Sequence, residues 1–429
     1  MKALKIWLIL MAAALAVFAF NGAALAFHDG GVAYCEGCHT MHNSVGGAVV
    51  NTPGGVKGTV GNGLNEYLLQ GSDPSSTCLN CHAKNTMGAN IQVLSSDGTA
   101  YTPGGDFYWV NKTYTYSPWA GANMTSEGYN HGHSVIASDF GLSEDSHFAG
   151  NVGPGGTYPA SNLACNSCHN PHGRVNGGTR NSEGPVKASG SYGPGFCTPD
   201  ASGICGNYRL LADGLYNAGD PAVFGSSSAQ GFPVQGYHYT ANAPVAVAPQ
   251  DFREKEDGYG TGSGIEHVDY GTGIAEWCAN CHGAFLNNSG GTGTGYHRHP
   301  AGDSAKLGGL ASLYNSYVKS GDYAGDSSKS YLPLVPFERG VATGLVANSP
   351  AGPDGANAAV MCLSCHRAHA SAFDEMTRWD TSAEFMSASS ALIATSKPWA
   401  ANAPYYGWDI VGQMGSYQRN LCNKCHVQD

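Results

Sequence analysis

Strong hydrophobic patterning is confined to the beginning of the chain. After Lys2 and Lys5, residues 6–20 form an unbroken apolar run, and Ala24-Leu25-Ala26 fits the small-residue pattern before a signal-peptidase site. The run has 15 residues, which is short for a helix that spans a bilayer, and no other stretch of the sequence approaches spanning length. The pattern therefore predicts a signal peptide over residues 1–26 and an exported protein over residues 27–429.

The rest of the sequence shows little periodicity of either helical or strand type. Residues 307–319 and 382–393 are the best candidates for amphipathic helices, and much of the remainder is Gly, Pro, Asn, Ser and Asp, which favour turns. Length alone suggests two or three domains. We nevertheless predict a single domain, mostly irregular (coil and turns), with a few short helices and minimal β-structure, because so irregular a chain needs a core of another kind.

Composition and charge narrow the classes of partner. Charged residues make up 12% of the chain, about half of the roughly 25% that is usual in globular proteins. Without Lys2 and Lys5, 19 basic residues stand against 32 acidic ones, a balance of −13. Nucleic-acid binding calls for a basic surface, so no nucleic-acid partner is expected.

Twelve of the 14 cysteines belong to one repeated motif, CxxCH, the attachment signature of c-type haem. Two thiols three residues apart lie on one helical turn and reach the two haem vinyl groups, while the adjacent His reaches the iron. Zinc ribbons and disulfides are the alternative, but about 0.02 copies are expected by chance at this composition. The six motifs are Cys35-Glu-Gly-Cys38-His39, Cys78-Leu-Asn-Cys81-His82, Cys165-Asn-Ser-Cys168-His169, Cys278-Ala-Asn-Cys281-His282, Cys362-Leu-Ser-Cys365-His366 and Cys422-Asn-Lys-Cys425-His426.

Six covalently bound haem c groups would supply the missing core, making this a haem-cored multihaem cytochrome c. The proximal histidines are 43, 87, 113, 84 and 60 residues apart, which is too irregular for a solenoid. We expect long segments to wrap the haems as loops.

Eleven further histidines are available for six distal positions, so every haem could be bis-histidine. His42, His172 and His369 each follow a proximal His by three residues, and a helix would place both histidines on one face. Because the haem plane separates its two axial ligands, the second His must serve a neighbouring haem.

Three further distal ligands are expected in loops and at the start of the mature chain. His133 is favoured over His131, and His299 over His297, while His28 would be tied down by ligation itself. The ordinary surface or hydrogen-bonded histidines are expected to be His147, His238 and His267. A short disulfide loop is expected between Cys197 and Cys205, with two free thiols or a metal site as the alternatives.

Several blocks of sequence resemble the extracellular hexahaem cytochromes of metal-reducing bacteria that polymerise into conducting filaments, the outer-membrane cytochrome S family. The main departures lie between about residues 179 and 236. The matching blocks are Phe27-His28-Asp29-Gly30-Gly31-Val32-Ala33, Cys35-Glu-Gly-Cys38-His39-Thr-Met-His42, Thr102-Pro-Gly-Gly-Asp-Phe107, Pro154-Gly-Gly-Thr-Tyr-Pro159, Glu276-Trp-Cys278-Ala-Asn-Cys281-His282, Arg298-His-Pro-Ala-Gly302, Leu363-Ser-Cys365-His366-Arg-Ala-His369-Ala-Ser371 and Gln418-Arg-Asn-Leu-Cys422-Asn-Lys-Cys425-His426.

The resemblance implies alternating stacked and T-shaped haem pairs in a mostly coiled protein. It also implies that His42 crosses a head-to-tail subunit boundary to the haem of His366 in the next protomer. Other expected partners are an outer-membrane electron conduit or other cytochromes, and extracellular acceptors such as metal oxides. The distal ligands that the resemblance implies are His28, His42, His133, His172, His299 and His369.

Three classes of function remain to be weighed. They are a subunit of an electron-conducting filament on the outer cell surface, a discrete exported electron carrier, and a multihaem reductase. A reductase needs an open coordination position on iron, whereas here twelve axial histidines are needed and 17 are present. We therefore expect electron transfer rather than an enzyme, with the filament as the favoured class.

Overall fold

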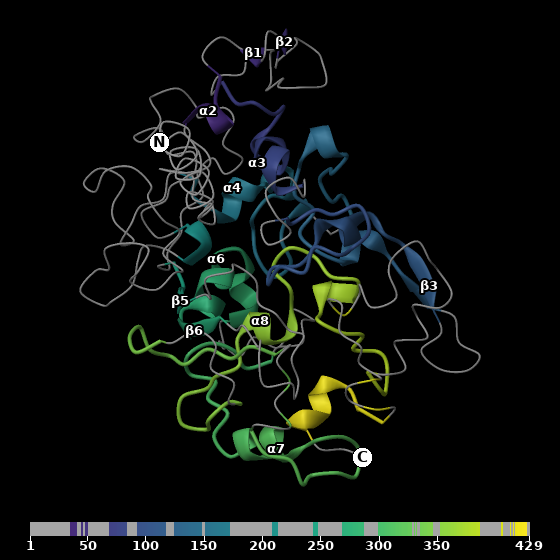
Figure 1. Ribbon diagram of the computed structural model, residues 1–429, viewed down its shortest axis with the longest axis vertical. Coiled ribbons are helices and arrows are strands. Elements are labelled where there is room, and N and C mark those ends of the chain that lie inside the picture. Colours follow the sequence, from purple (N-terminus) through teal and green to yellow (C-terminus); the bar gives the residue numbers. More distant parts are fainter. Residues whose placement is uncertain are drawn as a thin grey trace, which may run out of the picture.

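The computed structural model of the 429-residue chain (Figure 1) describes residues 35–40, 44–45, 48–49, 68–83, 92–116, 124–147, 151–171, 208–212, 243–247, 268–286, 299–327, 330, 332, 335–345, 352–386, 405, 412, 415 and 417–426. Several expectations fall outside these residues: the signal peptide, the Cys197 to Cys205 disulfide, and the positions of His28, His42 and His172. His238, His267 and His297 also lie outside them.

Regular elements are short in the described part of the chain, which confirms the predicted fold class. The strands form three antiparallel pairs of two to four residues each. The helices are α2 Cys35–Cys38, α3 Pro74–His82, α4 Cys165–Cys168, α6 Ile274–Leu286, α7 Leu310–Ser316 and α8 Cys362–Cys365. The paired strands are β1 Ser44–Val45 with β2 Ala48–Val49, β3 Tyr114–Tyr116 with β4 Met124–Ser126, and β5 Val245–Val247 with β6 Asp269–Thr272.

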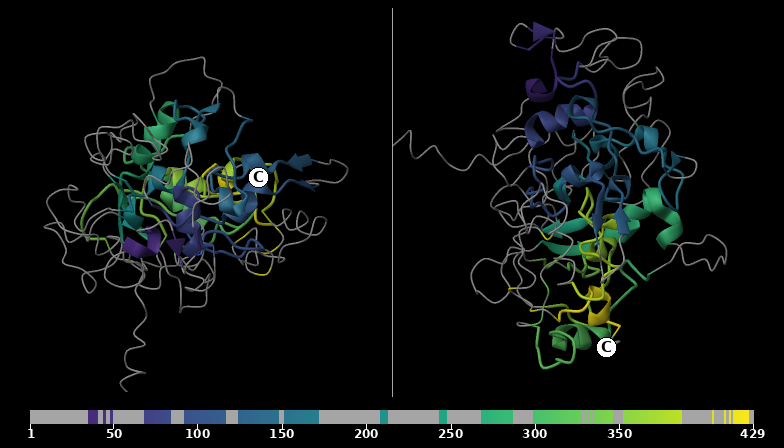
Figure 2. Two further views of the ribbon diagram at one scale, coloured as in Figure 1. Left: turned by 90° about the horizontal axis from the view of Figure 1, so that it is seen from above. Right: turned by 90° about the vertical axis from the view of Figure 1, so that its right-hand side faces the viewer.

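The helical turns that carry the CxxCH motifs follow one another in chain order along the longest axis of the molecule. In Figure 1, α2 lies near the top, α3 and α4 below it, α6 and α8 in the middle, and α7 beside the C-terminal turn near the bottom. The right-hand view of Figure 2 also places the purple segment at the top and the yellow C-terminal turn near the bottom, with a green helix beneath it. No helix in the described residues is long and apolar enough to cross a membrane.

The first long helix shows how local sequence fixes an element here. Asp73 accepts a hydrogen bond from the Ser76 backbone N–H (2.7 Å) and so caps α3, while Pro74 occupies the first helical position. Asp139, from a distant loop, in turn accepts from the hydroxyl of Ser72 (2.5 Å). The start of the second CxxCH segment is thus fixed both locally and by a tertiary contact.

A side-chain core does exist in the described region, around Phe107, Trp109, Phe373 and Trp379, all of them 4% exposed or less. Aromatic residues of this size each bury a large apolar area. Phe373 and Trp379 follow His369 in the sequence, and Phe107 stacks on its ring with ring centres 4.8 Å apart. Side-chain packing therefore helps to position this distal-ligand candidate.

The two helices expected from periodicity had different outcomes. Within residues 307–319, α7 forms as predicted, although only over Leu310–Ser316. The prediction over 382–393 is wrong where it can be compared, because residues 382–386 form turns and Phe385 pairs with Arg419. The Met386 N–H donates to Gln418 (2.8 Å), and this long-range pairing replaces the local helix. Residues 387–393 lie outside the described part.

Candidate haem-binding sites

All six CxxCH motifs place their two cysteines on a single helical turn, as haem attachment requires. We number them sites one to six in chain order. Sites one, three and five use the four-residue helices α2, α4 and α8, sites two and four lie within the longer α3 and α6, and site six uses a 3₁₀ turn, Leu421–Lys424, that ends at Cys425. The eleven motif cysteines with described side chains are outside disulfide bonds. The thiols are thus positioned for thioether bonds.

Sites one, three and five share a backbone arrangement that we call the clip. In each, the residue after the motif His donates its backbone N–H to the carbonyl of a residue in a separate segment. The residue two positions after that acceptor donates its own N–H back to the carbonyl of the second Cys of the motif. The donor–acceptor pairs, at 2.5–2.9 Å, are Thr40–Leu68 and Gln70–Cys38 at site one, Asn170–Leu210 and Ala212–Cys168 at site three, and Arg367–Met376 and Arg378–Cys365 at site five.

The clip segments use left-handed backbone at residues other than glycine. At site three Arg209 and Leu210 have φ of 50° and 56°, at site five Glu375 and Met376 have φ of 52° and 49°, and at site one Leu68 has φ of 51°. Such conformations cost of order 1–3 kcal/mol each. The same unfavourable conformation therefore recurs at three sites, where it turns backbone carbonyls toward the motif.

The clip corrects one expectation from sequence. A helix was expected to carry both histidines of the HxxH pairs, but α4 and α8 end at the second Cys, and His169 and His366 have extended backbone (ψ of 131° and 156°). The pairing with the clip segment stops each helix before the His. In the pair whose two members are both described, the ring of His369 faces His169 of site three, so His366 and His369 would serve different irons.

Carbonyl acceptors fix the ring orientation of the motif histidines at sites three, four and five. Nδ1–H of His169 donates to the carbonyl of Arg209 (2.8 Å), and that of His366 to the carbonyl of Glu375 (2.7 Å); both acceptors are left-handed clip residues. At site four, His282 donates to Pro154 (2.7 Å). A His whose Nδ1 is protonated in this way presents the lone pair of Nε2 to a metal.

Two of the expected distal ligands, His133 and His369, lie on adjacent segments. The His133 N–H donates to the His369 carbonyl (2.9 Å), and the His369 N–H donates to Gly104 (2.6 Å). Burial, followed by the nearby His282, lowers the pKa of His133 to about 4, and burial, followed by His169, lowers the pKa of His369 to about 3. Both rings are therefore neutral at neutral pH, the form that binds metal.

Three proximal histidines face an expected distal one at a characteristic distance. The ring centres are 6.2 Å apart for His169 and His369, 5.9 Å for His282 and His133, and 6.2 Å for His426 and His299. Two imidazoles on opposite sides of one metal have ring centres about 6.2–6.4 Å apart, given metal–nitrogen bonds of about 2.0–2.1 Å and about 1.1 Å from nitrogen to ring centre. The residues present therefore fit bis-histidine iron at these three sites.

Two other described histidines, His131 and His147, make contacts that do not suit an iron ligand. His131 is completely buried, and both of its ring nitrogens have partners: the Trp109 carbonyl at Nδ1 (3.2 Å) and the Ser126 hydroxyl at Nε2 (2.5 Å). His147 is exposed, bonds Asp145 (3.0 Å), and stacks on Tyr129 with ring centres 3.9 Å apart. The contacts of His131 therefore favour His133 as the ligand. Those of His147 are typical of an ordinary surface His.

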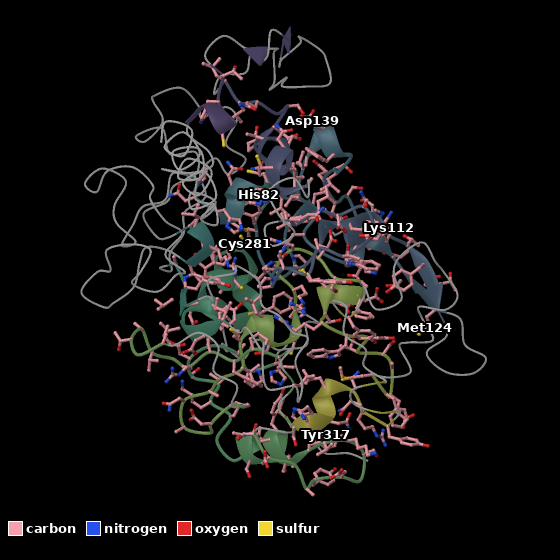
Figure 3. The ribbon with its side chains drawn as sticks, in the orientation of Figure 1. His82, Lys112, Met124, Asp139, Cys281 and Tyr317 are labelled. Carbon is pink, nitrogen blue, oxygen red and sulfur yellow. The ribbon has the colours of Figure 1, made fainter. Side chains whose placement is uncertain are left out.

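The sites lie next to one another in chain order. The pKa of Cys78 is raised first by its hydrogen bond to the Cys165 thiol, then by burial, and also by Cys38. Cys168 has a raised pKa from burial and from Cys281, and Cys365 from burial and from Cys422. Thiols interact over short distances, so successive sites are neighbours, and Figure 3 shows His82 above Cys281 along the same axis. Sites four and five meet at Cys278 and Cys362, whose side chains interact.

Comparisons with known proteins agree with this arrangement. The chain is 42% identical, over 463 aligned residues and the full length of both proteins, to the c-type cytochrome OmcS of Geobacter sulfurreducens. The chain belongs to the OmcS family. Two solved structures of OmcS filaments, one described as nanowires, match with a TM-score of 0.71 and 38% identity, covering 94% of this chain and 100% of theirs. No general protein-family model matches the sequence.

As a member of the OmcS family, the chain is a c-type cytochrome that carries haem c. Sequence reasoning had identified the motifs and the distal candidates but missed the clips, the carbonyl acceptors and the pairing of rings. The signal for a clip is faint: Leu68-Leu69 and Leu210-Leu211 are similar, but the third clip has Met376-Thr377.

Proposed function

We propose that this protein moves electrons through six bis-histidine haems as the subunit of an extracellular cytochrome filament. The main support is the set of three histidine pairs whose ring centres are 5.9–6.2 Å apart. With both axial positions filled by His, the iron at these sites would have no open coordination position for a substrate. When bound, haem c supplies a one-electron Fe(III)/Fe(II) couple, and two His ligands hold its potential lower than a Met ligand would.

The pairings follow a rule that extends to the remaining haems. His369, the extra His of site five, faces the proximal His of site three, two sites back along the chain. By the same step, His172 of site three would bind the haem of site one. His28 then remains for site two, because His133 and His299 face sites four and six.

Applied to site one, the rule predicts that the iron bound by His42 belongs to another protomer. His42 has no site two steps back in its own chain, while the haem of His366 at site five has no distal ligand among the residues assigned above. The two gaps are complementary, so His42 of one protomer would bind the site-five haem of the next. Such a head-to-tail contact generates an open filament when its rotation does not close. The OmcS structures are themselves filaments.

A discrete electron carrier with the same haems is the second candidate, and a reductase the third. Site chemistry does not separate the first two, but assembly does. We expect the terminal partners to be an outer-membrane electron conduit or other cytochromes on one side and extracellular acceptors such as metal oxides on the other.

The test is His42→Ala, with His369→Ala as its matched control. His42→Ala should keep six thioether-bound haems, convert the site-five haem to a high-spin form, and leave monomers or short oligomers in negative-stain micrographs. His369→Ala should convert the site-three haem, inside the protomer, and retain filaments. Long filaments with six low-spin haems in His42→Ala would show that surface contacts alone join the subunits.

A further inference from the structure

Three carboxylates, none of them assigned to a haem, meet in the interior beside the motif helices of sites four and five. Glu276 comes from α6, Asp303 from the loop before α7, and Glu338 from a strand-like segment that pairs with both Tyr270 and Ala359. One oxygen from each lies within 4.8 Å of the other two. Glu338 is completely buried.

Each carboxylate has one oxygen occupied and one without a partner. The Ile274 N–H donates to Oε2 of Glu338 (3.1 Å), the Asp303 N–H to Oε1 of Glu276 (3.3 Å), and the Thr272 hydroxyl to Oδ2 of Asp303. The opposite oxygens are buried and have no hydrogen-bond partner: Oε1 of Glu338, Oε2 of Glu276 and Oδ1 of Asp303. Leaving oxygens of this kind buried is strongly unfavourable unless something neutralises or binds them.

No basic side chain fills the gap among the described contacts. The neighbouring Lys306 donates instead to the carbonyls of Arg339 (3.1 Å) and Asn357 (2.7 Å), and Arg339 pairs with Asp269 (3.0 Å). The surroundings are also tight, because a Cβ on Gly302, whose φ is +94°, would lie 2.6 Å from Oε1 of Glu276. Gly302 therefore lets the loop approach the cluster closely.

We propose that Glu276, Asp303 and Glu338 bind a divalent cation, and that this cation is Ca²⁺. Oxygens bound to Ca²⁺ at about 2.3–2.6 Å lie at most about 5 Å apart, which suits the observed spacing, and Ca²⁺ accepts several carboxylates together with water or carbonyl oxygens. Mg²⁺ prefers one or two carboxylates and retains more water, and Zn²⁺ prefers nitrogen and sulfur.

The site would join two parts of the electron path. Glu276 lies two residues before Cys278 of site four, and the segment paired with Glu338 leads from Ala359 into Cys362 of site five. Bound Ca²⁺ would fix α6 against that segment and neutralise most of the negative charge between the two haems. The site is thus structural, with an electrostatic effect on its neighbours.

The experiment is equilibrium dialysis of the haem-loaded protein against radioactive Ca²⁺, from micromolar to millimolar concentrations. The wild type should bind one Ca²⁺ per chain, and Mg²⁺ should displace it only in large excess. Glu338→Gln and Asp303→Asn should each weaken binding by about tenfold or more. Glu144→Gln, at an exposed glutamate, should bind like the wild type.

Misfolding is separated from loss of the site by the haem spectrum and the intact mass, which should be unchanged in all the variants. In addition, Ca²⁺ should raise the Tm of the wild type relative to chelator, and it should not do so in Glu338→Gln. The proposal is overturned if the wild type binds no stoichiometric Ca²⁺. It is equally overturned if Glu338→Gln, with all haems intact, binds as tightly as the wild type.

Discussion

A single methyl group at Gly104 should remove an iron ligand without touching the haem. The Cβ of an alanine at this position would lie 2.7 Å from Nδ1 of His369 and 2.8 Å from its Cε1. The ring cannot turn away freely, since it stacks on Phe107 with ring centres 4.8 Å apart, and its backbone N–H is bonded to Gly104 itself at 2.6 Å. Under the proposed bis-histidine ligation, the expected consequence is displacement of His369 from the iron of site three.

The size of the effect follows from these distances. Ordinary contact begins at 3.4 Å, so a separation of 2.7 Å must open by 0.7 Å. A metal–nitrogen bond of about 2.0–2.1 Å cannot lengthen by that amount and remain a bond. Overpacking of this kind costs about 1–3 kcal/mol in a protein interior. Either the backbone around Gly104 moves, at that cost, or the site-three haem loses its distal ligand.

Electron paramagnetic resonance of the oxidised protein distinguishes these outcomes. Gly104→Ala should give a high-spin ferric signal from one haem, and carbon monoxide should then bind that haem after reduction. The control is Gly309→Ala, where a Cβ would meet nothing within 4 Å, and which should leave the spectrum unchanged. A fully low-spin Gly104→Ala protein with unaltered stability would refute the geometry derived for His369.

Three further predictions test other parts of the molecule. In the native protein, carbon monoxide should change the reduced spectrum very little, because the proposed ligation leaves every iron six-coordinate. A stoichiometric shift at even one haem would revive the reductase class. His131→Ala should lower the free energy of unfolding by about 2–4 kcal/mol, because it removes two buried hydrogen bonds, yet all haems should stay low-spin; loss of a low-spin haem would make His131 a ligand. Burial, then Glu276 and Asp303, raise the pKa of Glu338 from 4.5 to about 8. Because the folded pKa exceeds the unfolded one, the stability contributed by its neutral form is present below about pH 4.5 and is lost as the pH rises through about 8. Thermal melts in chelator should show this decline and Ca²⁺ should suppress it; equal slopes with and without Ca²⁺ would contradict it.

The sequence could predict those parts of the site that are formed by residues close together in the chain. CxxCH is one helical turn, and the HxxH extension is visible three residues later, so the attachment residues and half of the distal candidates follow from local chemistry. Composition predicted the irregular fold for a related reason. A chain with 61 glycines and few periodic segments favours turns and loops over long helices or strands.

The remaining features depend on pairing between distant residues. His169 finds its carbonyl acceptor at Arg209, 40 residues away, and Glu276 meets Glu338 across 62 residues. The helical geometry expected at the HxxH pairs failed for the same reason, since the clip ends the helix. Left-handed backbone at Arg209 and Glu375 is equally invisible, because these residue types give no sign of it.

The clips also show that the chain has a hidden repeat. Sites one, three and five combine a short helix, a clip and an HxxH pair, whereas α3 and α6 carry sites two and four on longer helices. The chain is therefore three successive two-site units whose connecting loops differ so much that the spacing of histidines conceals them. In this view, the extra His of each unit serves the unit before it. Under the proposed pairing, the junction between two subunits of the filament uses the same bond as the junction between two units inside a protomer. In both, the extra His of one unit binds a haem of the unit before it. One coordinate bond of this kind would therefore continue the chain of haems from subunit to subunit.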